Sequence, residues 1–235
     1  MILLNNVEIG YDKMLFEIDC LTLIKGKVYT LIGANGKGKT TFLKTLVGEL
    51  APLKGVFSID ALKSVDLTRG ERSKRITFVP SKQVDVDFLR VKDFVALGRT
   101  PYTNLIGMCN SSDHLKVVSS LELLKISHLK DCFLNQISDG EKQLAAISKA
   151  IVQDTDVIIL DEPTAFLDYS NRINVFELLK EIAIKLNKVI LFSSHDIDSI
   201  LELKTELLLL NQHSKKMEFY SANTISKTDL IKIAF

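Results

Sequence analysis

Several residue types are scarce in this 235-residue chain, which has no tryptophan, 4 prolines and 3 cysteines. The cysteines Cys20, Cys109 and Cys132 lie far apart and form no Cys-x-x-Cys pair. Their odd number and wide spacing make a disulfide framework or a zinc site improbable. We therefore expect buried thiols in a reducing cytosol.

Long apolar runs are missing as well. Uninterrupted apolar stretches such as residues 157–160 and 207–210 fall far short of the roughly 18 residues that a membrane-spanning helix needs. The N-terminus is apolar only over residues 1–4 and carries no basic segment, so no secretory signal is predicted. The sequence thus predicts a chain that does not cross a membrane.

Neither sign of charge is in excess. The chain has 30 Lys and Arg against 29 Asp and Glu, a formal net charge of +1. Such a balance gives no broad field for holding polyanions, so a purely electrostatic nucleic-acid binder is not expected. With 46% hydrophobic and 25% charged residues, the composition is that of a globular protein. The length favours one large domain over residues 1–235.

The pattern of apolar residues predicts an α/β fold. Short strands are expected over 2–9 and 16–24, with a turn at 25–27, followed by a strand over 28–32 that is buried on both faces. Apolar residues at helical spacing then predict a helix over 40–50, ended by Pro52.

The rest of the chain alternates between helices and strands. Helices are expected over 91–97, 113–125, 138–152 and 169–186, and strands over 157–160 and 189–192. Strand–helix–strand alternation is typical of a parallel sheet. The resulting fold class is a phosphate-loop α/β protein with a mainly parallel core sheet, an N-terminal antiparallel β part and a helical subdomain inserted at approximately 84–154.

Residues 33–40, Gly-Ala-Asn-Gly-Lys-Gly-Lys-Thr, match the phosphate-loop pattern G-x-x-x-x-G-K-[ST] between an expected strand and helix. Glycines let backbone N–H groups surround phosphate oxygens, and the helix adds its positive dipole end. Lys39 would neutralise charge on the β- and γ-phosphates, and Thr40 would offer its hydroxyl to Mg²⁺. The nucleotide-binding residues expected here are Gly33, Asn35, Gly36, Gly38, Lys39, Thr40 and Thr41.

Two acids, Asp161 and Glu162, follow the apolar run 157–160. A buried strand at this point would deliver both carboxylates to the edge of a nucleotide pocket, where Asp161 would hold Mg²⁺ through water and Glu162 would orient or deprotonate the attacking water. These motifs alone leave open a kinase, a GTPase, a recombinase-like ATPase or a transporter ATPase. A guanine-specific Asn-Lys-x-Asp motif is missing, since residues 187–190 read Asn-Lys-Val-Ile.

Residues 137–143, Ile-Ser-Asp-Gly-Glu-Lys-Gln, lie ahead of these acids. Locally they form a capping box, with Ser138 at the start of a helix and Glu141 in its first turn. The segment resembles the Leu-Ser-Gly-Gly-Gln signature of the ATP-binding subunit of ATP-binding cassette (ABC) transporters, and the resemblance covers essentially the whole chain. It implies that Ser138 and Gly140 bind the γ-phosphate of an ATP held by a second copy of the chain.

Further positions match this family in order. The resemblance implies that Tyr11 stacks on adenine, that Asp168 ends a loop touching the opposite subunit, and that His195 lies near the γ-phosphate. It also implies that a glutamine binds Mg²⁺ after a Val-Pro pair, but here Ser81 and Lys82 come before Gln83. Gln83 is assigned this role with Ser81 as the alternative.

Three other residues depart from the family pattern. Asp139 and Glu141 replace a glycine and the glutamine of the signature, while Lys37 adds a cation to the phosphate loop. Intact Lys39, Glu162 and His195 nevertheless argue against a degenerate cassette that binds nucleotide without turnover.

Residues 95–102, Val-Ala-Leu-Gly-Arg-Thr-Pro-Tyr, resemble the subgroup that energises import of iron chelates (siderophores, haem) or cobalamin. From the residues alone, this segment is a helix stop followed by a turn. The resemblance implies a homodimer that hydrolyses ATP with Mg²⁺, lies on the cytoplasmic face of the membrane, and works with an integral membrane permease and, indirectly, an extracytoplasmic substrate-binding protein. The alternatives are another metal-ion importer or a soluble ABC ATPase without a transport role.

Overall fold

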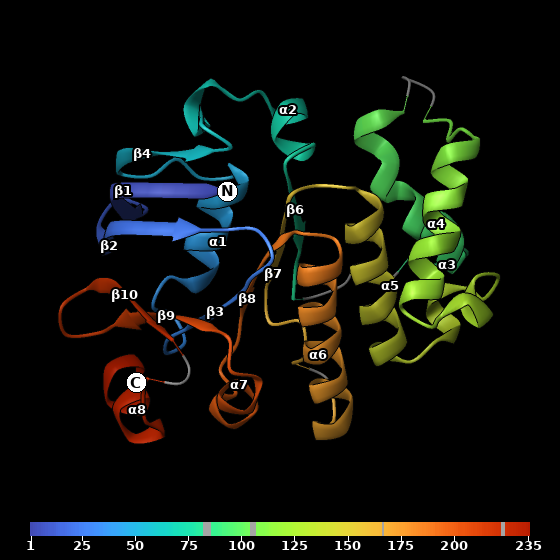
Figure 1. Ribbon diagram of the computed structural model, residues 1–235. Coiled ribbons are helices and arrows are strands. Elements are labelled where there is room, and N and C mark those ends of the chain that lie inside the picture. Colours follow the sequence, from blue (N-terminus) through green and yellow to red (C-terminus); the bar gives the residue numbers. More distant parts are fainter. Residues whose placement is uncertain (82–85, 104–106, 166, 222–223) are drawn as a thin grey trace.

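The computed structural model describes residues 1–81, 86–103, 107–165, 167–221 and 224–235. Its strands join into one sheet in the order β5-β4-β1-β2-β10-β9-β3-β8-β7-β6 (Figure 1). The strands are β1 Ile2–Gly10, β2 Met14–Leu23, β3 Val28–Ile32, β4 Lys54–Ile59, β5 Leu62–Lys63, β6 Ile76–Val79, β7 Val157–Leu160, β8 Val189–Ser193, β9 Glu206–Asn211 and β10 Lys216–Ser221.

The core of the sheet is parallel. Strands β9, β3, β8, β7 and β6 pair in parallel, and every residue of β3, β7 and β8 is buried. Strands covered on both faces are mainly apolar, as the runs of Val, Ile and Leu predicted, with Thr30 and Ser193 as the polar exceptions. Because these strands run in the same direction, the loops that follow Ile32, Leu160 and Ser193 leave the sheet at the same edge, where α/β proteins bind ligands.

The N-terminal part of the sheet is antiparallel, which confirms the predicted fold class. Strand β1 pairs antiparallel with both β2 and β4. A short parallel pairing, Lys216 opposite Glu17, joins this part to β10 and the core. The Lys216 ammonium also lies 2.8 Å from the Asp19 carboxylate.

Helices cover both faces of the sheet (Figure 1). The α-helices are α1 Lys39–Val47, α2 Arg69–Ser73, α3 Val91–Ala96, α4 Ser111–Leu123, α5 Asp139–Val152, α6 Tyr169–Lys185, α7 Ile197–Leu203 and α8 Lys227–Ala234. The 3₁₀ helices are η1 Ser64–Asp66, η2 Leu97–Tyr102, η3 Ser127–Leu129 and η4 Leu134–Gln136.

Two local expectations were wrong. The helix expected over 40–50 ends at Val47, because Gly48 adopts φ 81° and its N–H closes onto the carbonyls of Lys44 and Thr45. None of the three cysteines is the buried thiol that was expected: Cys109 and Cys132 are half-buried, and Cys20 is exposed because it lies on the face of β2 that solvent reaches. No disulfide is formed by any of the cysteines, all of which lie in the described ranges.

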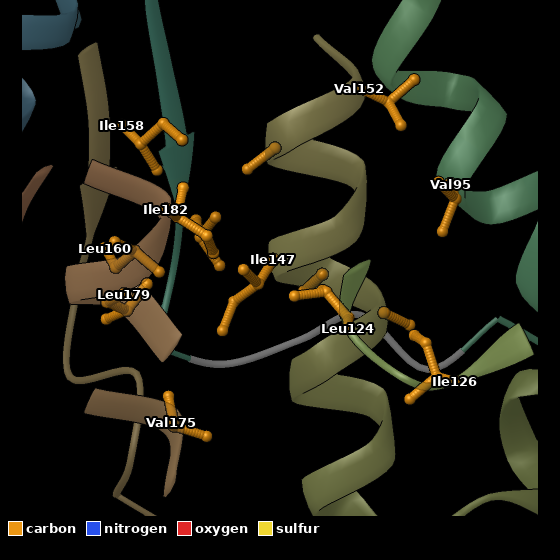
Figure 2. Packing of buried hydrophobic residues seen from close by; sticks show 14 of the residues in the cluster. Val95, Leu124, Ile126, Ile147, Val152, Ile158, Leu160, Val175, Leu179 and Ile182 are labelled. Atoms are coloured by element: carbon orange, nitrogen blue, oxygen red, sulfur yellow. The ribbon is translucent and has the colours of Figure 1, made fainter. Parts of the chain in front are cut away.

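Helices α3, α4 and α5 stand together between β6 and β7 in the chain (Figure 1). Helix α5 packs on both sides: Ile147 points to the side where Ile182 of α6 and Leu160 of β7 lie, while Leu124 and Val95 lie on the side of the other helices (Figure 2). This helical block therefore shares one core with the sheet. The inserted helical subdomain over approximately 84–154 stays a prediction.

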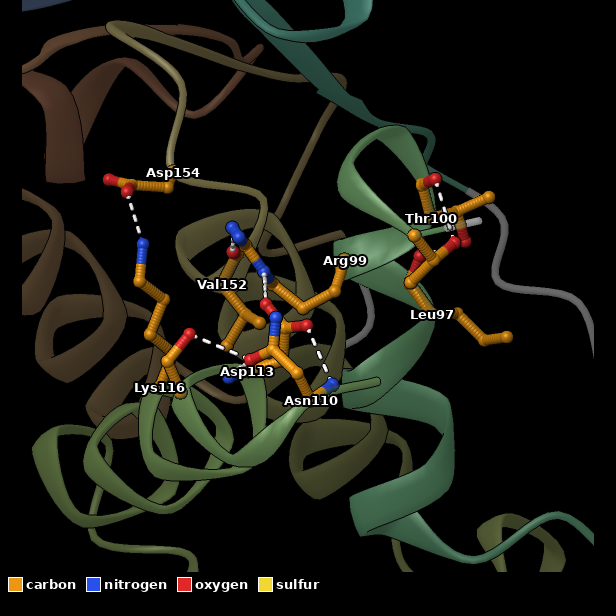
Figure 3. Close-up of polar contacts among 10 residues, drawn as sticks. Leu97, Arg99, Thr100, Asn110, Asp113, Lys116, Val152 and Asp154 are labelled. Carbon is orange, nitrogen blue, oxygen red and sulfur yellow. Dashed lines mark hydrogen bonds and ion pairs between the residues drawn. The ribbon is translucent and has the colours of Figure 1, made fainter. Parts of the chain in front are cut away.

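The segment expected to be a helix stop and a turn, around Gly98 and Pro101, is the 3₁₀ helix η2 with Pro101 inside it. Arg99 is buried there, and its Nε donates to Asp113 Oδ1 at 2.7 Å while Nη1 donates to the Val152 carbonyl at 2.9 Å (Figure 3). Gly98 lies against α5, since an added Cβ would be 2.3 Å from the Lys149 carbonyl oxygen. Among the described residues, no helix is long and apolar enough to cross a bilayer.

Candidate nucleotide site

The loop 33–40 connects β3 to α1 at the carboxyl edge of the parallel strands. Gly38 has φ 103°, and a Cβ there would meet Leu15 and Phe16 at 3.0 Å, so this position needs glycine. Helix α1 begins at Gly38 without a side-chain cap. Its first N–H groups and the positive end of its dipole are therefore available to an anion.

Lys39 lies inside this loop and is 7% exposed. Its Nζ donates to the carbonyl oxygens of Gly33 at 2.7 Å and Ala34 at 3.4 Å. Burial lowers the pKa of Lys39, and the carboxylates of Glu162 and Asp161 oppose this shift. The loop thus holds a partly desolvated cation, which a phosphate would stabilise.

Asp161 follows β7 and connects the loop to the neighbouring strand. Thr40 Oγ1 donates to Asp161 Oδ2 at 3.0 Å, and Ser193 Oγ donates to Asp161 Oδ1 at 2.5 Å. A hydroxyl beside a carboxylate is the oxygen donor set that Mg²⁺ accepts. The donors present therefore fit a magnesium ion at Thr40 and Asp161.

Glu162 has a left-handed backbone with φ 46°, and its N–H donates to Ser193 Oγ at 2.8 Å. Its Oε1 lies 3.4 Å from Nδ1 of His195, which follows β8 and is 56% exposed. The structure thus brings Lys39, Thr40 and Asp161 together with Glu162 and His195, five residues selected from the sequence. Such an assembly can hold a phosphate, a divalent cation and an attacking water.

Ser138 and Gly140 lie at the start of α5. Ser138 Oγ donates to Glu141 Oε2 at 2.8 Å, and the backbone N–H of Ser138 donates to the same oxygen at 2.9 Å. These bonds, the backbone one first, lower the pKa of Glu141. Both residues line a cavity of about 580 Å³ that α4 and α6 border, and the loop 33–40 does not.

The remaining predicted site residues are placed as follows. Asp168 caps α6, since its Oδ1 accepts from the Asn171 N–H at 2.8 Å. Tyr11 is 57% exposed on the turn between β1 and β2, and Thr41 is buried in the first turn of α1. Gln83 lies outside the described residues.

Two residues of the site were not predicted from the sequence. Ser193 contacts both Asp161 and the N–H of Glu162, yet in sequence it is only the polar end of a buried strand. Arg172 donates from Nη2 to the Leu167 carbonyl at 3.1 Å and pairs with the Asp196 carboxylate. Its single sequence signal is a cation in the first turn of a helix, where the helix dipole disfavours positive charge.

Comparisons with known proteins agree with this geometry. A family model described as ABC transporter matches residues 18–165. An uncharacterised ABC transporter ATP-binding protein of Methanocaldococcus jannaschii is 32% identical over 228 residues, covering 97% of this chain and 79% of the relative. The petrobactin import ATP-binding protein of Bacillus subtilis is 32% identical over 200 residues, covering 84% of this chain and 78% of the relative.

A solved structure, described as an inward-facing conformation of a metal-chelate type ABC transporter, superposes with a TM-score of 0.84 at 27% identity, covering 99% of this chain and 88% of that one. The family match includes the phosphate loop, the segment around Ser138 and the acids Asp161 and Glu162. The resemblance drawn from sequence is therefore confirmed, and the chain belongs to the ABC transporter family as an ATP-binding subunit with ATPase activity.

Proposed function

We propose that the chain binds ATP with Mg²⁺ on the loop 33–40 and hydrolyses it at the ends of β7 and β8. The observation that carries this proposal is the continuous chain of contacts from Thr40 through Asp161 and Ser193 to Glu162. These contacts support a Mg²⁺ site between the Thr40 hydroxyl at the start of α1 and the Asp161 carboxylate after β7, with the Glu162 carboxylate next in the chain.

Each residue then has a role set by its chemistry. Lys39 and the N-terminus of α1 bind the β- and γ-phosphates, and Thr40 and Asp161 hold Mg²⁺, which neutralises charge on the transferred phosphoryl group. Glu162 orients or deprotonates the attacking water. His195, close to the Glu162 carboxylate, contacts the γ-phosphate.

We infer that the active unit is a homodimer. Within one chain, the cavity lined by Ser138 and Gly140 is separate from the loop 33–40, so these residues need a nucleotide from another copy. A symmetric dimer in which each copy supplies both elements makes two equivalent sites and closes the assembly. In that dimer, Asp168 faces the opposite chain, and Tyr11 stacks on the adenine of its own site.

The transport partner is an integral membrane permease, with the ATPase on its cytoplasmic side and a substrate-binding protein on the other. We propose an iron chelate (siderophore or haem) or cobalamin as substrate. Support comes from residues 95–102 and from relatives whose names include petrobactin import. Another metal-ion importer is the alternative, and a soluble ABC ATPase without a transport role is the third candidate.

Purification of the chain with its associated membrane proteins tests this proposal. The co-purifying metal or organic ligand would identify the substrate. Recovery of a soluble assembly factor in place of a permease would overturn the importer function.

Gln83 is proposed to bind Mg²⁺ and to couple hydrolysis to the permease. A Gln83→Ala variant is expected to lose permease-stimulated hydrolysis while ATP binding stays nearly intact. If Ser81→Ala has this effect and Gln83→Ala has none, the role belongs to Ser81.

A further inference from the structure

The contacts of the His195 ring do not fix its position. The side chain is 56% exposed, and its contact with Glu162 spans 3.4 Å between Nδ1 and Oε1. A contact of this length is longer than an ordinary hydrogen bond and holds the ring only weakly. The orientation of the ring must therefore depend on how the backbone on either side of His195 is held.

On the strand side, Ser193 is fully buried and tied to Asp161 and to the N–H of Glu162. On the helix side, Asp196 caps α7 by accepting from the Ser199 N–H at 3.3 Å and from Ser199 Oγ at 2.6 Å. Both cap bonds run to Ser199 of the same helix and tie the Asp196 carboxylate to no neighbouring element. A second contact is needed to fix the position of Asp196, on the α7 side of His195.

Arg172 provides this second anchor. Its guanidinium pairs with the Asp196 carboxylate and, through Nη2, donates to the Leu167 carbonyl at 3.1 Å. The side chain is 26% exposed, and among the described residues Nε is buried without a hydrogen-bond partner. A cation at this place opposes the dipole of α6 and loses hydration, so the position does not favour the helix itself.

We propose that Arg172 is a positioning residue for hydrolysis: it ties Asp196 to the carbonyl of Leu167 and thereby holds His195 at the γ-phosphate. The inference rests on the proposed role of His195. Arg172 also lines a small cavity together with Glu162, Thr164 and His195. Its planar fork can bind the carboxylate and the carbonyl at once, which a lysine ammonium does less well.

The bond to Leu167 gives the anchor a further consequence. Leu167 directly precedes Asp168, the cap of α6, and the segment ending at Asp168 is the one proposed to face the second copy. Arg172 thus links the segment that ends at Asp168 to the backbone next to His195. A displacement of Leu167 should therefore shift Asp196, and a displacement of Asp196 should shift Leu167.

The experiment measures ATP turnover and ATP affinity of the full chain. Arg172→Gln should lower kcat about tenfold while KM for ATP stays within about twofold, because small displacements of reacting groups slow chemistry more than binding. The kcat of Arg172→Lys should lie between those of Arg172→Gln and the wild type. Arg69→Gln, on the exposed surface of α2, is the matched control and should leave both constants unchanged.

A double-mutant comparison separates positioning from simple destabilisation. If Arg172 acts through His195, the variant Arg172→Gln with His195→Ala should be no slower than His195→Ala alone. If Arg172→Gln lowers kcat tenfold both in the wild-type chain and in the His195→Ala variant, the inference is overturned. Asp196→Asn, which keeps a capping oxygen but loses the charge that faces Arg172, should reproduce the loss of kcat even if Arg172→Gln folds poorly.

The outcomes distinguish this inference from the proposed function. If His195→Ala retains full turnover, the role assigned to His195 is wrong and the inference falls with it. If His195→Ala is slow while Arg172→Gln and Asp196→Asn turn over like wild type, the proposed function stands and the positioning role of Arg172 is refuted.

Discussion

The hydroxyl of Ser193 donates a hydrogen bond to the Asp161 carboxylate at 2.5 Å. The same oxygen accepts from the N–H of Glu162 at 2.8 Å, and Ser193 is fully buried. One side chain from β8 therefore sets the orientation of both acids at the end of β7.

Ser193→Ala should raise the Mg²⁺ concentration needed for half-maximal hydrolysis, because Asp161 loses the partner that orients it. It should also reduce stability by about 1–3 kcal/mol, the usual result of leaving a buried polar group unpaired. A magnesium titration of ATPase activity and a denaturant melt measure the two effects. Ser148→Ala is the control, since Ser148 is fully buried and paired with Ser120 at 2.6 Å in the helical block. A similar magnesium shift in that control would contradict the assignment.

Lys39→Ala should weaken ATP binding, because it removes the cation of the phosphate loop. A charge-assisted contact of this kind contributes about 1.5–3 kcal/mol, or roughly a tenfold to hundredfold change in Kd. Equilibrium binding of ATP measures it. Wild-type affinity in this variant would mean that residues 33–40 are merely a surface loop.

The lowered pKa of Lys39 gives a pH effect with a definite sign. Burial lowers this pKa below its ordinary value of 10.5, whereas bound phosphate favours the charged form and raises it. ATP binding should therefore take up protons between the pKa of Lys39 in the free protein and its higher pKa in the ATP complex, and affinity should fall as pH rises through the free-protein value. Calorimetry in two buffers of different ionisation enthalpy detects the uptake, which should vanish in Lys39→Ala.

Glu162→Gln keeps the shape of the pocket but removes the carboxylate that positions water. ATP should bind and persist unhydrolysed, holding the dimer closed. Ser138→Arg in the same chain should prevent closure, because a bulky cation would occupy the place of the γ-phosphate. Light scattering with Mg²⁺ and ATP distinguishes the two variants. Hydrolysis at the wild-type rate by Glu162→Gln would show that this residue is not the base.

The buried pair of Arg99 and Asp113 should dominate the stability of the helical block. Removing one partner of a buried ion pair leaves an uncompensated charge and costs about 3–5 kcal/mol, so Arg99→Leu should unfold at much lower denaturant concentration. Hydrogen bonds from Asn110 and then Arg99 lower the pKa of Asp113 below 3.8. Its stabilisation is therefore complete above this ordinary value and is lost as pH falls through the lowered one.

The control for this prediction is the exposed pair of Lys185 and Glu181 on α6. Lys185→Ala should leave stability nearly unchanged. If both variants lose the same stability, the buried pair has no special role.

The parallel core and the phosphate loop were predictable because their signals are local. A run such as 157–160 contains only apolar residues, and a pattern such as 33–40 has a fixed spacing. Strand β4 gave no such signal, since its first three residues are exposed. No secondary structure was predicted for it or for β5, α2 and β6.

The supporting residues of the site were not predictable for a different reason. Ser193 lies 32 positions from Asp161, and Arg172 lies 24 from Asp196. Both pairs meet only because β7 and β8 are neighbours and α6 connects them. A single sequence carries no spacing rule for contacts that the fold creates.

The contact between Gly98 and Lys149 has a mechanical consequence. Two backbones touch there with no side chain between them, and packed protein interiors are nearly incompressible. Helix η2 and helix α5 therefore have no slack at this contact, and a displacement of residues 97–102 is passed on to α5, whose first turn follows Ser138. A single methyl group added at Gly98 would force these two backbones apart.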